Sequence, residues 1–322
     1  MQTVLRLGLL AVVVTGCARG PSSAPPVETV AGARSPPQAA PSFRVDVTGH
    51  GPPMILIPGL ASSGETWTTT VDHLRDRYTC HVLTLPGFAG VPPIEGALLP
   101  AMTVELARYI AAQRMARPVI VGHSLGGELA LAFAAEHPEL VGPIVIVDSL
   151  PFLGAILGAD SVEQARPTLE QIRAGMASQT QDQYDAAMRS GAMTRSMVAS
   201  PADHQRIIAW GVASDRATVE GALVELFGTD LRPRLERITA PALVIGTWIG
   251  LADRPGAAVD RATVVRTFHE QYASLPRMHF ALSETARHFV MFDDLAWFTA
   301  ELDRFLADPD AAVRDRGFSP PQ

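Results

Sequence analysis

Residues 118–127 read PVIVGHSLGG, and the stretch LGGELALAFAAEH continues from Leu125 until Pro138. A short β-branched apolar run therefore passes through the pattern G-x-S-x-G into a helical segment. In this strand–turn–helix context the serine stands on a sharp, strained turn, where small neighbours avoid clashes. The start of the helix also favours negative charge beside the serine. Ser124 is predicted to be a nucleophile, with Gly122 and Gly126 as the small neighbours that its turn requires.

Apolar runs on both sides of this motif alternate with segments of helical period. They are β-branched or leucine-rich and lack alternating polarity, which is typical of strands buried on both faces. The runs are Met54–Ile57, His81–Leu85, Val119–Val121, Ile144–Val147, Ala242–Ile245 and Met278–Leu282. Strands that alternate with helices predict an α/β fold, in which a mostly parallel sheet is covered by helices on both faces.

One long interruption breaks this alternation. Between the strand that ends before Asp148 and the next strand, residues 150–236 have the residue pattern of several helices. We predict that they form a helical lid, inserted after the sixth strand, over a site at the strand ends. The predicted core then comprises residues 43–149 and 237–310.

Two further motifs accompany the serine motif. Ile57-Pro58-Gly59-Leu60 follows one predicted strand, and Arg287-His288-Phe289 lies between the last strand and the C-terminal helical stripe. With these motifs in this order, the chain resembles the α/β-hydrolase-fold serine hydrolases over nearly all of residues 43–308. The resemblance implies that Ser124 attacks, that His288 is the base, and that the backbone N–H groups of Leu60 and Leu125 form the oxyanion hole.

The acid of the implied catalytic triad has two candidates. Family members often carry it about four residues beyond the penultimate strand, where this chain has Ile249. The first carboxylate after that position is Asp253. Some members instead place the acid after the preceding strand, where Asp148 stands. Because the acid orients the histidine and stabilises its charged form, either backbone origin is chemically acceptable, and both candidates stay open.

The implied reaction is hydrolysis of an ester of a small or medium apolar acyl substrate through an acyl-enzyme. An amidase, peptidase, lactonase or acyltransferase would use the same triad, because acyl-transfer groups do not reveal the leaving group. A tethered binding protein on the same fold, without turnover, is a third alternative. The sequence contains no H-E-x-x-H motif, no Cys/His cluster and no dinucleotide fingerprint, so neither a metal nor a cofactor is expected.

Composition narrows the choice of partners. The chain has 322 residues, of which 47% are hydrophobic, so it can bury a substantial core. Its formal net charge of −7 argues against binding to nucleic acid, which normally requires a clustered basic face. No apolar run approaches the roughly 20 residues of a membrane-spanning helix. A small-molecule acyl substrate is the expected partner.

The N-terminus has the pattern of a targeting segment. Residues 1–16 carry one arginine, an apolar stretch and small residues before Cys17, as a bacterial lipoprotein signal peptide does. Lipidation of Cys17 would then be the only membrane attachment. Residues 17–42 are rich in Pro, Ala and Ser, which predicts an extended tether. The expected location is the bacterial cell envelope, with the chain lipid-anchored at the outer membrane, or else secreted or periplasmic.

Overall fold

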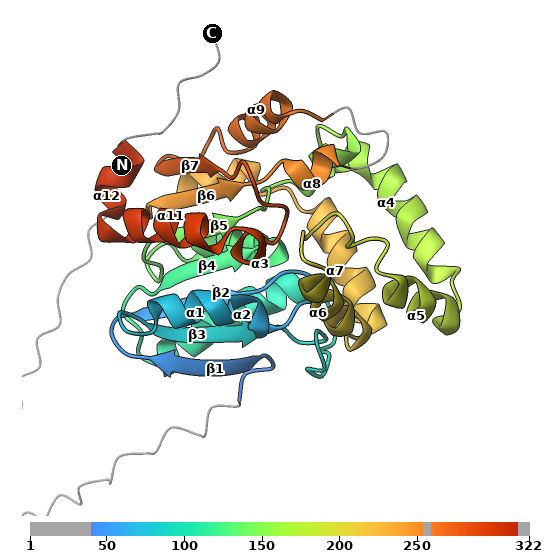
Figure 1. Cartoon of the computed structure of the whole chain (residues 1–322), viewed down its shortest axis with the longest axis horizontal. Helices are drawn as coiled ribbons and strands as arrows, with labels where there is room; N and C mark the ends of the chain where they lie inside the picture. The colour runs from blue at the N-terminus through green and yellow to red at the C-terminus, as the bar shows by residue number, and fades with distance from the viewer. Residues whose placement is uncertain (1–39, 254–258, 315–322) are drawn as a thin grey trace, which may run out of the picture. The chain divides into compact units, whose positions relative to one another are not determined.

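A single sheet of seven strands organises the described part of the chain, in the order β1-β3-β2-β4-β5-β6-β7 (Figure 1). The structure is a computed structural model that describes residues 40–253 and 259–314. The strands are β1 Arg44–Gly49, β2 Pro53–Ile57, β3 Thr79–Thr84, β4 Val119–His123, β5 Ile144–Val147, β6 Ala242–Gly246 and β7 Met278–Leu282. β1 pairs antiparallel with β3, and every other neighbouring pair is parallel.

Successive residues of the parallel strands bury their side chains on opposite faces of the sheet, as the pleat requires. In β2, Ile55 and Ile57 join one hydrophobic core, whereas Met54 and Leu56 join the other. All these side chains are fully buried, so the strands read as continuous apolar runs. The two cores lie on opposite faces of the sheet and contain most of its buried side chains.

Helices cover both faces. The first core is closed by α2 (Leu98–Ala112), α3 (Leu125–Glu136) and α9 (Arg261–Gln271), and the second by α1 (Thr68–Leu74), α11 (Leu295–Ala307) and α12 (Pro309–Arg314). Figure 1 shows α1 and α11 on the viewer's side of the sheet. Short helical turns join these elements: η1 Gly64–Trp67, η2 Leu153–Leu157, η3 Arg232–Arg237, α8 Ile249–Ala252 and α10 Val290–Asp293.

Four helices lie between β5 and β6, and we call α4–α7 the inserted helices. They are α4 Val162–Ala177, α5 Gln181–Ser190, α6 Pro201–Val212 and α7 Arg216–Gly228. They follow the fifth strand, so the expectation of an insertion after the sixth strand is wrong by one. The four runs predicted before the insertion are β2–β5, and β1 adds one strand, so the insertion follows the fifth strand of the sheet.

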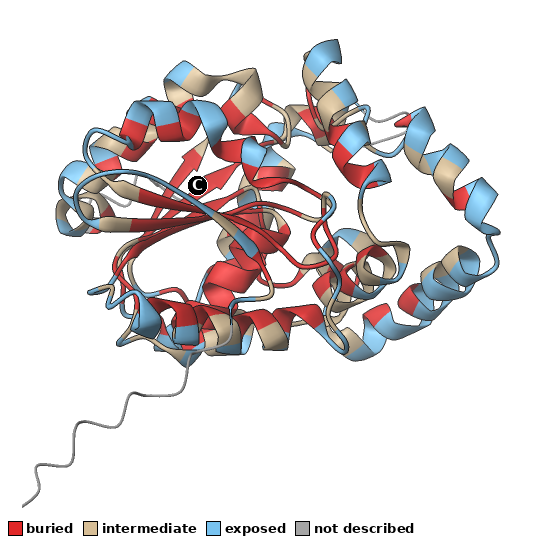
Figure 2. Cartoon of the chain, turned by 90° about the horizontal axis from the view of Figure 1, so that it is seen from below, coloured by how far each residue is buried: buried red, intermediate tan, exposed pale blue. Residues whose placement is uncertain are grey.

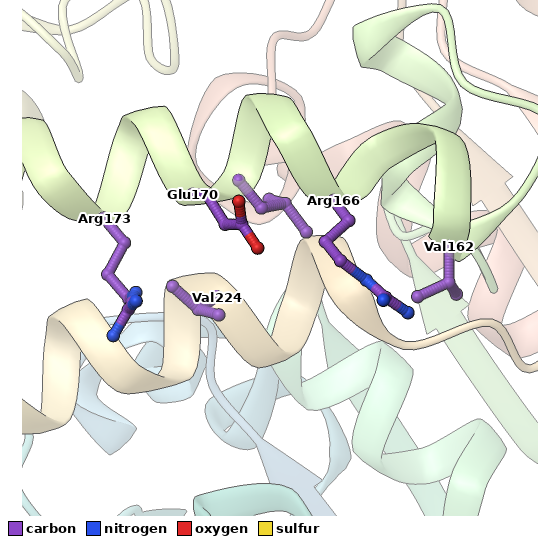
Figure 3. A pocket seen from close by; sticks show the side chains of 6 residues that line it. Val162, Arg166, Glu170, Arg173 and Val224 are labelled. Carbon is purple, nitrogen blue, oxygen red and sulfur yellow. The ribbon is translucent and has the colours of Figure 1, made fainter.

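The outer pair of inserted helices, α4 and α5, is mostly exposed (Figure 2). A hollow of about 140 Å³ lies between α4 and α7, and the residues in Figure 3 line it: Val162, Arg166, Leu169, Glu170, Arg173 and Val224. None of the predicted site residues is among them. The hollow therefore belongs to the packing between the two helices and is not the candidate active site.

The predicted fold class, a mostly parallel sheet with helices on both faces, is confirmed. The prediction missed β1, whose residues are largely exposed at the edge of the sheet. The division into signal peptide, tether, core and lid stays a prediction. Residues 1–39, with the predicted signal peptide and most of the tether, lie outside the described residues. None of the described helices combines the length and the apolar composition that a membrane-spanning segment needs.

Candidate active site

Ser124 lies on the turn between β4 and α3 with a positive φ of 54° and a ψ of −120°. This conformation is strained for a residue with a side chain. Two glycines make the turn possible. A Cβ atom on Gly122 would stand 2.1 Å from the Gly126 carbonyl oxygen, and one on Gly126 would stand 2.3 Å from the Ile57 carbonyl oxygen. The glycines of the motif are therefore required by close backbone contacts, as the sequence predicts.

Asp148 occupies the matching position at the end of the next strand. It also has a positive φ, 45°, and its backbone N–H donates to the Ile245 carbonyl at 2.7 Å. The Ser124 N–H donates to the Val147 carbonyl at 2.9 Å, which holds the two strand ends together. The nucleophile candidate and one acid candidate therefore leave adjacent parallel strands at the same edge of the sheet.

His288 brings its imidazole to Asp148. Its Nδ1 atom lies 2.6 Å from Asp148 Oδ2, and the two side chains are 25% and 15% exposed. Because a carboxylate oxygen only accepts hydrogen bonds, Nδ1 carries the proton of this contact, and in the neutral imidazole Nε2 is then the acceptor. This is the tautomer that a general base next to a serine needs.

The loop that carries His288 is fixed from two sides. Its carbonyl oxygen accepts a hydrogen bond from His123 Nε2 at 3.0 Å, and the Phe289 N–H donates to the Met197 carbonyl at 3.1 Å. His123 is fully buried, and burial with His288 nearby lowers the pKa of His123 well below its ordinary value. His123 is therefore neutral and serves as a donor to the loop.

Asp253, the other acid candidate, has a different partner. Its carboxylate pairs with the Arg287 guanidinium at 2.8 Å and is 50% exposed. The Arg287 side chain lies beside Gly250, because a Cβ atom added to that glycine would stand 3.4 Å from Arg287 Cβ. Asp253 thus ties α8 to the loop before His288. Of the two acids left open by the sequence, the structure brings Asp148 to the histidine.

The segment that carries Leu60, one of the two predicted oxyanion-hole residues, lies beside Ser124, and Leu125 follows the serine directly. A Cβ on Gly59 would stand 3.1 Å from Ser124 Cβ, so the Gly59–Leu60 segment runs beside the serine. Within the described residues, neither the Leu60 N–H nor the Leu125 N–H donates to an acceptor. The Ser124 hydroxyl likewise makes no hydrogen bond there. In ligand-free sites the serine–histidine contact is often long and closes only when substrate binds.

The sequence contains two cysteines, Cys17 and Cys80. Cys17 lies outside the described residues. Cys80 is fully buried in β3, and burial raises the pKa of its thiol to about 11, so it is not an activated nucleophile. Among the described residues there is no cluster of three His, Cys, Asp or Glu side chains that could hold a metal ion.

Sequence reasoning missed two residues that contact the site. Thr247 donates its backbone N–H to Asp148 Oδ1 at 2.9 Å and its hydroxyl to Asp148 Oδ2 at 2.8 Å. His123, noted only as part of the serine motif, supports the His288 loop. The position of Thr247 directly after an apolar strand, at the edge where Asp148 ends its own strand, was the available signal.

Comparison with known proteins shows the family to which the chain belongs. The model of the alpha/beta hydrolase family matches residues 54–301, and the chain belongs to this family. A pimeloyl-acyl-carrier-protein methyl ester esterase of Aeromonas hydrophila is 26% identical over 272 residues, which cover 82% of this chain and 99% of that protein. An esterase of the same name from Stenotrophomonas maltophilia is 31% identical, over 66% of this chain and 79% of its own length.

Solved structures agree on the fold. A thermophilic esterase from Thermogutta terrifontis superposes with a TM-score of 0.67 at 19% identity, covering 83% of this chain and 94% of that one. The enol-lactonase from Burkholderia xenovorans gives 0.66 at 17% identity, covering 83% and 96%. At these identities the likeness concerns the fold alone.

Proposed function

We propose that this protein hydrolyses an ester through an acyl-enzyme, with Ser124 as nucleophile, His288 as general base and Asp148 as the acid that orients the histidine. The observation that carries the proposal is the 2.6 Å contact between His288 Nδ1 and Asp148 Oδ2 beside a serine in a strained turn. This combination of tautomer, carboxylate and serine is the arrangement that acyl transfer needs. The names of the related esterases support an ester as the substrate.

The reaction proceeds in two halves. Ser124 Oγ attacks the acyl carbonyl carbon while His288 Nε2 takes its proton, and Asp148 stabilises the imidazolium that results. The tetrahedral intermediate collapses when His288 gives the proton to the leaving alkoxide, which departs as the alcohol. A water molecule then attacks the acyl-enzyme, with His288 again removing a proton, and the acid product leaves with Ser124 restored.

The N–H groups of Leu60 and Leu125 stabilise the oxyanion in both halves. Neither donates to an acceptor in the described chain, so both are available to the substrate oxygen. Removing one such donor typically costs about 3 kcal/mol in the transition state. The Leu125 donor also lies at the start of α3, where the helix dipole favours negative charge.

The inserted helices are proposed to act as the lid and to select the substrate. They join the loops at the site edge: the Gly90 N–H donates to the Ala213 carbonyl at 2.9 Å, and the Phe289 N–H donates to the Met197 carbonyl. A lid in this position shields the acyl-enzyme from bulk water and shapes the acyl pocket. We propose a small or medium apolar acyl group as the substrate.

The N-terminal segment is proposed to anchor the enzyme. The support is the sequence alone: an apolar stretch and small residues before Cys17, followed by a Pro/Ala-rich segment. Lipidation of Cys17 would place the hydrolase in the bacterial cell envelope. Metabolic labelling with a radioactive fatty acid tests this directly, since Cys17→Ser would abolish the label if the cysteine is the lipidated residue.

Turnover of matched substrates tests the proposed reaction. Purified protein is assayed with p-nitrophenyl esters of increasing acyl length and with the p-nitroanilides of the same acids. Faster turnover of the esters, abolished in Ser124→Ala, supports the ester hydrolase. Preference for the anilides would move the assignment to an amidase, and absence of turnover with all acyl donors would favour the binding protein.

A further inference from the structure

Thr247 lies directly after β6, at the edge of the sheet where Asp148 follows β5. The two strands pair in parallel with Val147 opposite Ile245, and this register brings residue 247 beside the Asp148 carboxylate. Thr247 is 4% exposed, so its polar atoms are out of reach of bulk water. A hydroxyl at such a position needs a partner, and Asp148 supplies it.

The two hydrogen bonds from Thr247 fix both oxygens of the carboxylate. The backbone N–H donates to Oδ1 at 2.9 Å, and Oγ1 donates to Oδ2 at 2.8 Å. Oδ2 is also the oxygen that accepts from His288 Nδ1 at 2.6 Å. With one donor on Oδ1 and two on Oδ2, the carboxylate cannot rotate about its Cβ–Cγ bond without breaking a hydrogen bond. The stiff χ1 angle of a threonine keeps the hydroxyl in place.

The backbone behind Asp148 is held by other groups. The Tyr272 hydroxyl donates to the Ser149 carbonyl at 2.7 Å, and the Asp148 N–H donates to the Ile245 carbonyl at 2.7 Å. Gly127 of α3 packs against Ser149, since a Cβ there would lie 2.7 Å from Ser149 Cβ. Loss of the Thr247 hydroxyl therefore removes one of the two donors to Oδ2, while the main chain around the carboxylate stays fixed.

We propose that Thr247 is a positioning residue, whose hydroxyl holds the Asp148 carboxylate in the orientation that keeps Oδ2 on His288. The inference rests on the proposed role of Asp148 in the triad. It assigns a function to a residue outside the triad: Thr247 acts on the reaction only through Asp148 and touches no reacting atom.

Three variants separate the hydroxyl from the shape of the side chain. Thr247→Val has nearly the same shape and keeps the backbone N–H but lacks the hydroxyl. Thr247→Ser keeps the hydroxyl and loses only a methyl group. The matched control is Thr103→Val in α2, because Thr103 is 2% exposed and its hydroxyl bonds the Leu99 carbonyl at 2.9 Å, away from the triad. If Thr247→Val does not fold, Thr247→Ala carries the same test.

The first measurement is kcat and KM with the best p-nitrophenyl ester. Thr247→Val is expected to lower kcat about tenfold with KM unchanged, because the lost bond to a charged group affects orientation and not substrate binding. Thr247→Ser is expected to keep kcat within about twofold of the starting protein. A kcat of Thr247→Val equal to that of the starting protein would overturn the proposal. Equal losses of kcat in Thr247→Val and Thr247→Ser would also overturn it.

The second measurement does not depend on turnover. The proton on His288 Nδ1 gives a low-field proton resonance when it is hydrogen-bonded to a carboxylate, and Asp148→Asn assigns it by abolishing it. The signal is expected in the starting protein and in Thr247→Ser, and shifted or broadened in Thr247→Val. Absence of the signal from the starting protein, or an unchanged signal in Thr247→Val, would contradict the positioning role. A Thr247-dependent signal in a protein without turnover would instead reject the proposed function alone.

Discussion

Helix α3 of the core and helix α4 of the inserted helices are stabilised in different ways. In α3, which begins directly after the proposed nucleophile, eleven of the twelve residues are buried. In α4, the outer inserted helix, two of sixteen are buried (Figure 2). The proposed nucleophile thus stands at the start of a deeply packed helix, and the region proposed to select the substrate is built on a sparsely packed one.

The two regions also differ in what fixes them. The strand ends that carry Ser124 and Asp148 are held by backbone hydrogen bonds and by glycine contacts that leave no room for a methyl group. Helix α4 is held at its ends by two arginines. Arg232 donates to the Asp160 carbonyl at 2.7 Å, and Arg216 donates to the Met176 and Gln179 carbonyls at 2.7 and 3.0 Å. A sequence change in α4 is therefore expected to leave the residues of the proposed triad undisturbed.

The largest expected effect separates the two acid candidates. Asp148→Asn is expected to lower kcat about 10⁴-fold, because an amide in place of the carboxylate favours the wrong histidine tautomer. Asp253→Asn weakens a half-exposed pair with Arg287 and is expected to change kcat less than about threefold. Both are measured in one ester assay. Full activity of Asp148→Asn together with a collapse of Asp253→Asn would exchange the roles of the two residues.

The next prediction contrasts a glycine in each helix by equilibrium unfolding in urea. Gly126→Ala puts a Cβ 2.3 Å from the Ile57 carbonyl oxygen and is expected to destabilise the fold by about 3 kcal/mol. Gly175→Ala in α4 meets nothing within 4 Å and is expected to stabilise it by up to about 1 kcal/mol. Equal effects of the two changes would erase the contrast between the packed and the open helix.

Glu128 lies one turn after the proposed nucleophile and is expected to make the stability of the protein depend on pH. Burial and the nearby Glu225 carboxylate raise the pKa of Glu128 well above its ordinary value. The folded protein therefore keeps a proton that the unfolded chain releases, so stability falls as pH rises from the ordinary carboxyl range towards the raised pKa. Glu128→Gln cannot ionise and is expected to flatten this fall, measured by urea unfolding across neutral pH. A steeper fall in the variant would contradict the assignment of the proton.

The smallest expected effect is on the inserted helices. Arg216→Ala removes two hydrogen bonds to the end of α4 and the stacking of the guanidinium on Tyr184, at 4.9 Å. It is expected to lower the local opening free energy of α4 by about 1–2 kcal/mol, visible as faster amide hydrogen exchange there. The control Arg189→Ala breaks one exposed pair with Asp185 and is expected to leave exchange unchanged. Equal exchange in both variants would show that Arg216 does not hold α4.

The parts that local patterns determine were predictable from the sequence. The parallel strands are continuous apolar runs because both faces are buried, and all six that were predicted are present. Strand β1 was missed because an exposed edge strand needs no apolar run. Ser124 and His288 sit in short motifs whose backbone geometry is local. The choice between Asp148 and Asp253 depends on how β5, β6 and the loop after β7 meet in space, which residue order alone does not fix.

The central claim is that Ser124 is an activated nucleophile. The most direct test is to label the purified protein with a fluorophosphonate and map the modified peptide, because only an activated serine reacts rapidly with this reagent. We predict stoichiometric label on Ser124 that is lost in His288→Ala. A folded protein that takes no label, or carries it on another residue, would contradict the account.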